Sequence, residues 1–398
     1  MRNFFHPYSR RSLSLSGALI AVSLLLNVAH AASTGTHYLV TNDDNSGNYV
    51  QNTVSFYKVG PDGELSYATS IDIGVTGGSG GYFPANRVVT LNSEQNQCVF
   101  ASDADTGMIA GIDSALKVVR ANGSSKDTGL SNGIGLALNS QYLYAGFTDD
   151  SSIGTFQIGP NCELTFEGDV VVGGLQAGDI DALAAHGNLL IATYGDGSIE
   201  SFNISSGVPV SNGDKQNSTA YVASRGATYP SGIDITQDGH FVVFGDTSTS
   251  TSVEVADISS GRLAATKVYH SSLGVSSSNI MLSPDETLLY VVNTQGDRVS
   301  AVFFDRATGI FSGGCTSGRI SGYSQNWSYL AGLALATNTG TGSEIYVAEF
   351  GSPKSAVAII QIASAGGQCS LQEAPTSPVS DPNSHALLSI ASFPPRQF

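Results

Sequence analysis

Six short apolar runs in the sequence are each preceded by polar residues whose side chains can bind or act on a small molecule. Arg87 and Asp181 have the clearest chemistry, because a guanidinium group can polarise a carbonyl while a carboxylate activates a water molecule. The same two side chains can instead form a structural ion pair. The other residues that we predict to bind a ligand at these positions are Asn86, Tyr229, Ser231, Asp234, Asn279, Trp327 and Tyr329.

Trp327 and Tyr329 form, with Tyr323, an aromatic group that has two interpretations. The rings can stack on a sugar, or they can fill a gap in a hydrophobic core, since aromatic side chains serve both purposes. Both interpretations stay open at this point.

A second set of polar residues is acidic and lies in the turns between apolar runs. Clustered carboxylates can hold calcium, which needs several oxygen ligands. However, Asp, Asn and Gly are also the residues that tight turns require, and no segment matches the complete calcium-loop pattern. We therefore predict no metal site and keep calcium as an alternative cofactor. The acidic residues are Asp43, Asp44, Asp103, Asp105, Asp149, Asp150, Asp196, Asp246 and Asp297.

These polar residues recur because the sequence itself repeats. Each unit consists of β-branched and aromatic runs separated by turn residues, which indicates strand, turn, strand, turn and strand. The second and third strands recur seven times, and equivalent residues of the first strands lie 47 to 53 residues apart. Repeats of this length are typical of β-propeller blades. We predict an all-β fold, a single seven-bladed β-propeller domain of four-stranded antiparallel blades over residues 32–398.

The last strand is predicted to complete the first blade. The first unit begins at its second strand, whereas the segment Leu387–Ala391 is an additional apolar run near the C-terminus. Adding this run to the first blade would close the ring and remove a free sheet edge.

Residues 1–31 have the features of an export signal. Arg2, Arg10 and Arg11 precede an apolar stretch, and Ala29-His30-Ala31 is a small-x-small cleavage site. The ordinary secretory route and the twin-arginine route are both compatible with this segment. No later apolar run is long enough to span a membrane. We expect an exported protein, periplasmic or extracellular.

The charge of the chain limits its partners. The net charge is −16, and cleavage after residue 31 would remove three arginines and make it −19. Such a surface repels phosphate backbones and anionic lipids, which disfavours nucleic acid and membrane surfaces. A small molecule or a protein is the expected partner. We predict a monomer, because a closed propeller needs no second copy to be stable.

The four cysteines are predicted to form two disulfides, as is usual in an oxidising compartment. Cys98 and Cys162 fall on the same face of neighbouring blades, and Cys315 and Cys369 fall in corresponding outer regions of the last two blades. The expected pairs are therefore Cys98–Cys162 and Cys315–Cys369.

The sixth unit resembles the lactonase-type seven-bladed propellers. The resemblance rests on Leu282-Ser283-Pro284-Asp285, on Leu289–Asn293 and on Asp305–Gly309. That family includes 6-phosphogluconolactonase-like and muconate-cycloisomerase-like proteins, and YVTN-type surface repeats are close to it. The resemblance implies the seven-bladed fold and lactone hydrolysis at the mouth of the central channel.

The sequence departs from the pattern of the enzymatic members, which carry Pro-His before the first strands and use His, Arg and Glu around the channel. Pro230-Ser231 keeps the proline without the histidine, and Arg87 is the residue that matches a channel arginine. We therefore predict a ligand- or partner-binding propeller that uses its acidic channel face without catalysis. A lactone hydrolase is the alternative, and a cation-dependent sugar-binding or adhesion module is a third hypothesis.

Overall fold

The computed structural model describes most of the chain beyond the N-terminal segment. Residues 1–36, which include the expected signal, lie outside the described part. Among the described residues, no helix is long and apolar enough to cross a membrane. The described ranges are 37–43, 51–76, 86–93, 96–103, 107–120, 133–147, 151–172, 180–226, 229–247, 252–270, 277–293, 297–321, 329–335, 344–350, 355–365, 368–381, 387 and 389–394.

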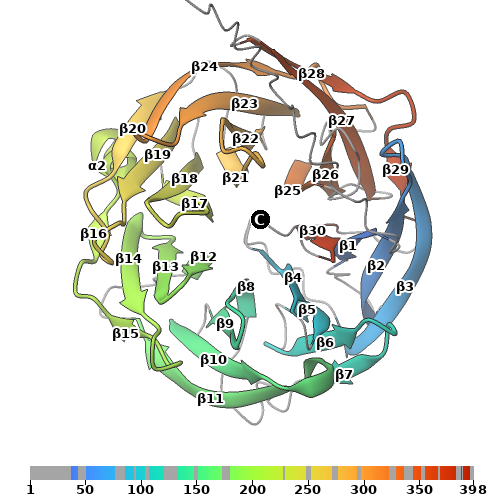
Figure 1. Cartoon of the computed structure of the whole chain (residues 1–398), viewed down its shortest axis with the longest axis horizontal. Coiled ribbons are helices and arrows are strands. Elements are labelled where there is room, and N and C mark those ends of the chain that lie inside the picture. Colours follow the sequence, from blue (N-terminus) through green and yellow to red (C-terminus); the bar gives the residue numbers. More distant parts are fainter. Residues whose placement is uncertain are drawn as a thin grey trace, which may run out of the picture. The chain divides into compact units, whose positions relative to one another are not determined.

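The described residues form seven antiparallel sheets that surround a central axis as blades (Figure 1). Blade 1 contains, from axis to rim, β30 (Ser389–Phe393), β1 (Tyr38–Asn42), β2 (Gln51–Val59) and β3 (Leu65–Thr76). Blade 2 contains β4 (Val88–Asn92), β5 (Gln97–Ser102), β6 (Ile109–Asp113) and β7 (Val118–Arg120). Blade 3 contains β8 (Gly133–Leu138), β9 (Tyr142–Phe147), β10 (Ser152–Ile158) and β11 (Leu164–Val171), with the 3-10 helix η1 (Pro160–Cys162) before β11.

The other four blades follow the same order. Blade 4 contains β12 (Ile180–His186), β13 (Leu189–Tyr194), β14 (Ser198–Asn203), β15 (Val210–Ser211) and β16 (Gln216–Asn217). The helix α2 (Thr219–Ser224) precedes blade 5, which contains β17 (Tyr229–Ile235), β18 (Phe241–Thr247), β19 (Ser252–Asp257) and β20 (Lys267–His270). Blade 6 contains β21 (Ser277–Leu282), β22 (Leu288–Asn293), β23 (Arg298–Asp305) and β24 (Ile310–Thr316). Blade 7 contains β25 (Tyr329–Leu335), β26 (Glu344–Phe350), β27 (Ala356–Ala365), β28 (Gln368–Glu373) and β29 (Val379–Ser380).

Five blades have the predicted four strands, and blades 4 and 7 have one extra short strand each. In blade 4 both β15 and β16 pair with β14, and in blade 7 both β28 and β29 pair with β27. The rim of these two blades is therefore divided into two pieces. The predicted seven-bladed, all-β fold is confirmed.

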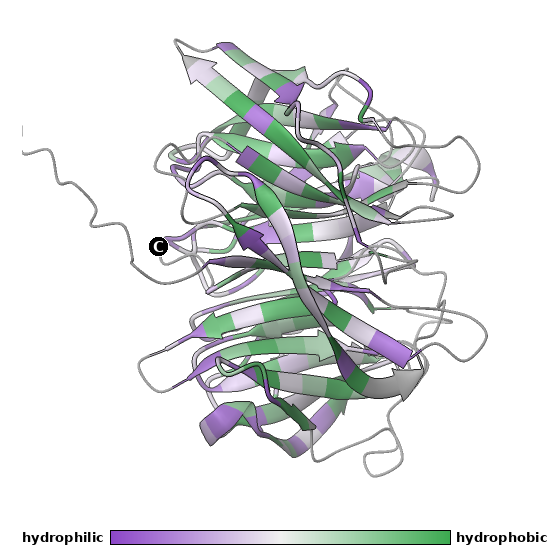
Figure 2. Cartoon of the chain, turned by 90° about the vertical axis from the view of Figure 1, so that its right-hand side faces the viewer, coloured by the Kyte–Doolittle hydropathy of each residue, from purple (hydrophilic) through white to green (hydrophobic). Residues whose placement is uncertain are grey.

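Packing between neighbouring blades explains the apolar runs of the sequence. Every residue of β22 is buried, because a central strand has a blade on each side. In the rim strand β11 Leu164 is buried, and the residues after it alternate between exposed and partly buried. The buried residues form seven hydrophobic clusters, each shared by two neighbouring blades. Figure 2 shows hydrophobic residues along the strands and hydrophilic residues at several turns.

The C-terminal strand closes the ring, as predicted. β30 pairs antiparallel with β1, with Asn42 opposite Ser389 and Tyr38 opposite Phe393. The side-chain oxygen of Ser389 also accepts hydrogen bonds from the peptide nitrogens of Arg87, at 3.1 Å, and Val88, at 3.3 Å. The strand is thus bonded within blade 1 and to blade 2. Figure 1 shows the first and last described strands side by side.

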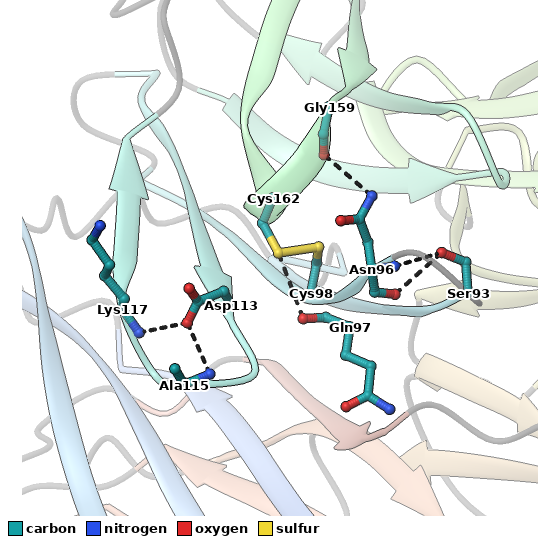
Figure 3. Close-up of a disulfide and its surroundings, with 9 residues drawn as sticks. All are labelled: Ser93, Asn96, Gln97, Cys98, Asp113, Ala115, Lys117, Gly159 and Cys162. Atoms are coloured by element: carbon teal, nitrogen blue, oxygen red, sulfur yellow. Dashed lines mark hydrogen bonds between the residues drawn. A yellow bond between two sulfur atoms is a disulfide. The ribbon is translucent and has the colours of Figure 1, made fainter.

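Both predicted disulfides are present. Cys98–Cys162 joins β5 of blade 2 to the turn that precedes β11 of blade 3, with Cα atoms 5.6 Å apart (Figure 3). Beside this disulfide, the side-chain amide of Asn96 donates to the carbonyl of Gly159 at 3.2 Å. Cys315–Cys369 joins the rim strands β24 and β28 of blades 6 and 7. The cross-links therefore connect neighbouring blades.

Close packing around the first disulfide leads to a stability prediction. A Cβ atom on Gly111 of β6 would overlap the backbone carbonyl oxygen of Cys162, which cannot move without shifting the disulfide. Gly111→Ala should therefore lower the free energy of unfolding by about 2–3 kcal/mol. Chemical denaturation checks this value. Gly159→Ala is the matched control, because its Cβ would be 3.6 Å from the nearest atoms, and equal losses in the two variants would contradict the prediction.

Candidate ligand site in the central channel

The innermost strands of all seven blades surround a central cavity. Its volume is about 570 Å³, which lies within the range typical of small-molecule sites. Residues of β4, β8, β12, β17, β21, β25 and β30 line it. Each of these strands is the last strand on the axial side of its sheet.

The cavity wall combines aliphatic side chains with peptide groups. An edge strand has one side without a ladder partner in its own sheet, so its peptide N–H and C=O groups face outward from the sheet. In a propeller this side faces the axis. The wall can therefore pack against apolar parts of a ligand and form hydrogen bonds with hydroxyl or carbonyl groups. The aliphatic lining residues are Val88, Val89, Leu136, Leu138, Leu183, Ile233, Ile235, Leu282, Leu333, Leu335 and Ile390.

Polar side chains lie at several points of the wall. The described lining contains two carboxylates, Asp234 and Glu286, and no lysine or arginine. Both carboxylates are engaged with protein groups. Asp234 accepts hydrogen bonds from the peptide nitrogens of Ile235 and Leu282, each at 2.8 Å. Glu286 is buried, and its Oε2 lies 3.3 Å from the guanidinium of Arg306. The bond from Leu282 to Asp234 links blades 5 and 6.

The two residues predicted to be catalytic lie on blades that are not adjacent. Arg87 directly precedes β4 of blade 2, and Asp181 lies in a β-bulge of β12 in blade 4, so that β8 of blade 3 lies between them. Arg87 is 1% exposed and Asp181 is 7% exposed. Neither residue is part of the described cavity lining. Their catalytic role stays a prediction.

The residues predicted to bind a ligand occupy different positions. Asn86 and Asp234 line the cavity. Ser231 and Asn279 are buried, and the Ser231 hydroxyl hydrogen-bonds to Thr247 in the neighbouring strand of the same blade. Binding by these buried residues stays a prediction.

The predicted aromatic residues are only partly within the described structure. Tyr229 begins β17 and Tyr329 begins β25, and the structure describes the backbone of each. Trp327 lies outside the described residues. The choice between stacking on a sugar and core packing therefore stays open for this aromatic group.

The sequence interpretation missed several polar lining residues. His186, Gln237, Ser283 and Glu286 lie where the innermost strands end and turn toward the second strands. The predicted site residues lie mainly at or before the opposite ends of these strands. A signal was available, because each of these residues lies within four residues after the end of a repeated apolar run.

Several acidic turn residues are buried. Asp43, Asp103 and Asp246 are each 0% exposed. Burial, with a smaller contribution from Asp381, raises the pKa of Asp43 to about 7. Burial and the nearby Glu254 raise the pKa of Asp246. Among the described residues, no group of three potential ligand side chains is arranged to hold a metal ion. Calcium as a cofactor stays an alternative prediction that rests on the sequence.

The repeat, the closed ring and the central cavity agree with a comparison against protein families. The family described as "Lactonase, 7-bladed beta-propeller" matches residues 112–382. The chain belongs to the lactonase family. Among curated proteins, no relative matches it.

Solved structures share the fold at low sequence identity. A 6-phosphogluconolactonase-like protein of Bacteroides fragilis has a TM-score of 0.67 and 14% identity, and the match covers 90% of this chain and 99% of that one. A similar protein of Bacteroides uniformis has a TM-score of 0.68 and 12% identity, with the same coverage. The periplasmic gluconolactonase of Pseudomonas aeruginosa has a TM-score of 0.63 and 14% identity, also covering 90% and 99%. At these identities the likeness shows the lactonase-type fold alone.

Proposed function

We propose that this lactonase-family propeller is an exported protein that binds a neutral small molecule in its central channel and releases it unchanged. The observation that carries the proposal is the cavity wall. It offers aliphatic side chains and strand-edge peptide groups, while its two described carboxylates are engaged with backbone N–H groups and with Arg306. The two disulfides support export, because disulfides persist in oxidising compartments.

The charge of the protein selects among ligands. The chain has a net charge of −16, and the described cavity lining contains no lysine or arginine that would neutralise a phosphate. An anionic ligand would therefore be repelled as it approached the channel. A neutral ring that carries hydroxyl or carbonyl groups, such as a sugar or its lactone, fits the wall better.

Filling the channel should abolish binding. Ser392 of β30 lines the cavity and is partly exposed, so Ser392→Phe places a large side chain at the wall. Isothermal titration with glucose and with glucono-1,5-lactone should show at least about tenfold weaker binding by this variant. Ser66→Phe is the matched control, because Ser66 is exposed on the rim strand β3. Equal affinities of Ser392→Phe and the unmodified protein would refute a channel site.

Lactone hydrolysis is the second candidate, favoured by the match to the lactonase family. It is tested by following acid release from a lactone panel, with and without a chelator. Turnover above the uncatalysed rate would show that the protein is an enzyme and not a binding protein. In that case neutral lactones should react faster than phosphorylated ones. Loss of turnover in Arg87→Ala or Asp181→Ala would support the predicted catalytic residues.

A further inference from the structure

A second cavity lies between blades 4 and 5. Its volume is about 280 Å³, and its lining comes from the β12–β13 turn, the end of β14, the β17–β18 turn and the segment after β19. His186, the last residue of β12, lines this cavity and also the central channel. The two cavities therefore share His186 as a lining residue.

The second cavity has both apolar and polar lining residues. Leu189 and Ile258 belong to the hydrophobic cluster between blades 4 and 5 and form the apolar part of the lining. The polar lining residues are Asn188, Asn203 and Ser259. The side-chain oxygen of Asn203 accepts a hydrogen bond from the peptide nitrogen of Ser205 at 2.9 Å, and the Ser259 hydroxyl donates one to Asp257 at 2.6 Å. No charged residue is part of its described lining. This combination suits a neutral hydroxylated ring, whose C–H groups pack on apolar side chains while its hydroxyls bond to amides.

Two glycine residues shape the second cavity: Gly187 leaves open space, and Gly239 lies against His186. Gly187 has a φ of +56°, and a Cβ on it would meet nothing within 4 Å. At Gly239, by contrast, a Cβ would lie 2.6 Å from Cδ2 of His186. The imidazole thus packs directly on the backbone of Gly239, in the space that any larger residue would occupy.

We propose that the cavity between blades 4 and 5 is a second subsite for a neutral hydroxylated ring, joined to the central channel at His186. The inference rests on the proposed function of the channel and specifies its ligand. The ligand would then be a disaccharide or another glycoside with two linked rings. One ring occupies the channel and the other packs against Leu189 and Ile258.

Titration calorimetry with glucose, maltose and cellobiose tests this inference on the full chain. At least one disaccharide should bind about tenfold more tightly than glucose, or tighter still, because the second ring adds contacts. Gly187→Asn should remove this advantage, since its side chain starts at the cavity lining and Asn tolerates a positive φ. Gly213→Asn is the matched control: its φ is +69°, its Cβ would also meet nothing within 4 Å, and it lines neither cavity.

The possible outcomes separate this inference from the proposed function. If glucose binds and Ser392→Phe abolishes its binding, but no disaccharide binds more tightly, the second subsite is refuted and the channel site stands. An advantage of the disaccharide that persists in Gly187→Asn also refutes the subsite. If none of the sugars and lactones binds to the unmodified protein, both proposals are wrong. Loss of the advantage in Gly187→Asn, with its retention in Gly213→Asn, supports the two-ring ligand.

Discussion

A chain that ends at Asp381 should not form the closed propeller. It lacks β30, which is the innermost strand of blade 1 and the partner of β1. It also loses the buried side chains of Leu387, Ile390 and Phe393, which pack in the clusters that blade 1 shares with blades 7 and 2. Each such side chain contributes about 2–5 kcal/mol, and the three together are comparable with the entire stability of a domain, about 5–15 kcal/mol.

Circular dichroism and calorimetry of the purified chains check this prediction. The shortened chain should show no cooperative thermal transition at the temperature at which the full chain unfolds. A chain that ends at Pro394 retains β30 and is the control for loss of the terminal residues alone. A synthetic peptide spanning residues 382–398 should restore the transition, since it supplies the missing strand. A normal transition in the chain that ends at Asp381 would show that closure by β30 is dispensable.

The stability of the propeller should fall as the pH rises from 5 to 8. Burial and the nearby Asp381 raise the pKa of Asp43 to about 7, and burial and Glu373 raise the pKa of Glu349 to about 8. Between the ordinary carboxyl pKa and these values, the folded protein binds protons that the unfolded chain has released. Stability therefore decreases with pH in this window, by about 3 kcal/mol through Asp43 alone.

Other titrating groups define the limits of this window. Below about pH 4 stability should fall again, because hydrogen bonds to Asp257 and Asp305 lower the pKa of these carboxyls and protonation breaks the bonds. Burial lowers the pKa of His37 from its ordinary value of 6.5. At pH values below 6.5 this residue therefore makes stability increase with pH, against the main trend. We expect maximum stability near pH 5.

Asp43→Asn isolates the contribution of the buried carboxyl. Asp43 is 0% exposed and accepts hydrogen bonds from the hydroxyls of Thr41, at 2.8 Å, and Ser55, at 2.7 Å. An amide resembles the protonated acid and does not ionise, so the variant should show a flatter dependence of the unfolding free energy on pH. Urea unfolding at a series of pH values measures it. Asp62→Asn, in an exposed turn of the same blade, should keep the original slope. An unchanged slope in Asp43→Asn would assign the dependence to other groups.

The repeat made much of the architecture predictable from sequence. Apolar runs such as Leu289–Asn293 and Val299–Phe304 recur in order, and the corresponding strands β22 and β23 pair in the predicted antiparallel way. The extra run at Leu387–Ala391 indicated the closing strand, which the structure places at Ser389–Phe393. The cysteine pairs followed from the expected positions of Cys98 and Cys162 on the same face of neighbouring blades, and of Cys315 and Cys369 in corresponding outer regions. These features depend on local strand formation and on the order of the blades along the chain.

The candidate site was less predictable, because side chains from several blades form it. Asn86 and Asp234 line the cavity, whereas Ser231 is buried and bonded to Thr247 of its own blade. His186 has no distinguishing motif, and its contact with both cavities depends on the packing of blade 4 against Gly239 of blade 5.

The sequence by itself determined the strands, the number of blades, the closure of the ring and the disulfide pairing. The physical reason is that the strands and blades depend on a repeating pattern of apolar and turn residues, which also places each cysteine within its blade. Only the tertiary structure decided which polar groups face the channel and which become buried between blades. Asp43 reads as an ordinary turn residue in the sequence, but packing of neighbouring strands removes it from water and raises its pKa. Solvent exposure depends on the blade beside each residue, and the local sequence does not contain that information.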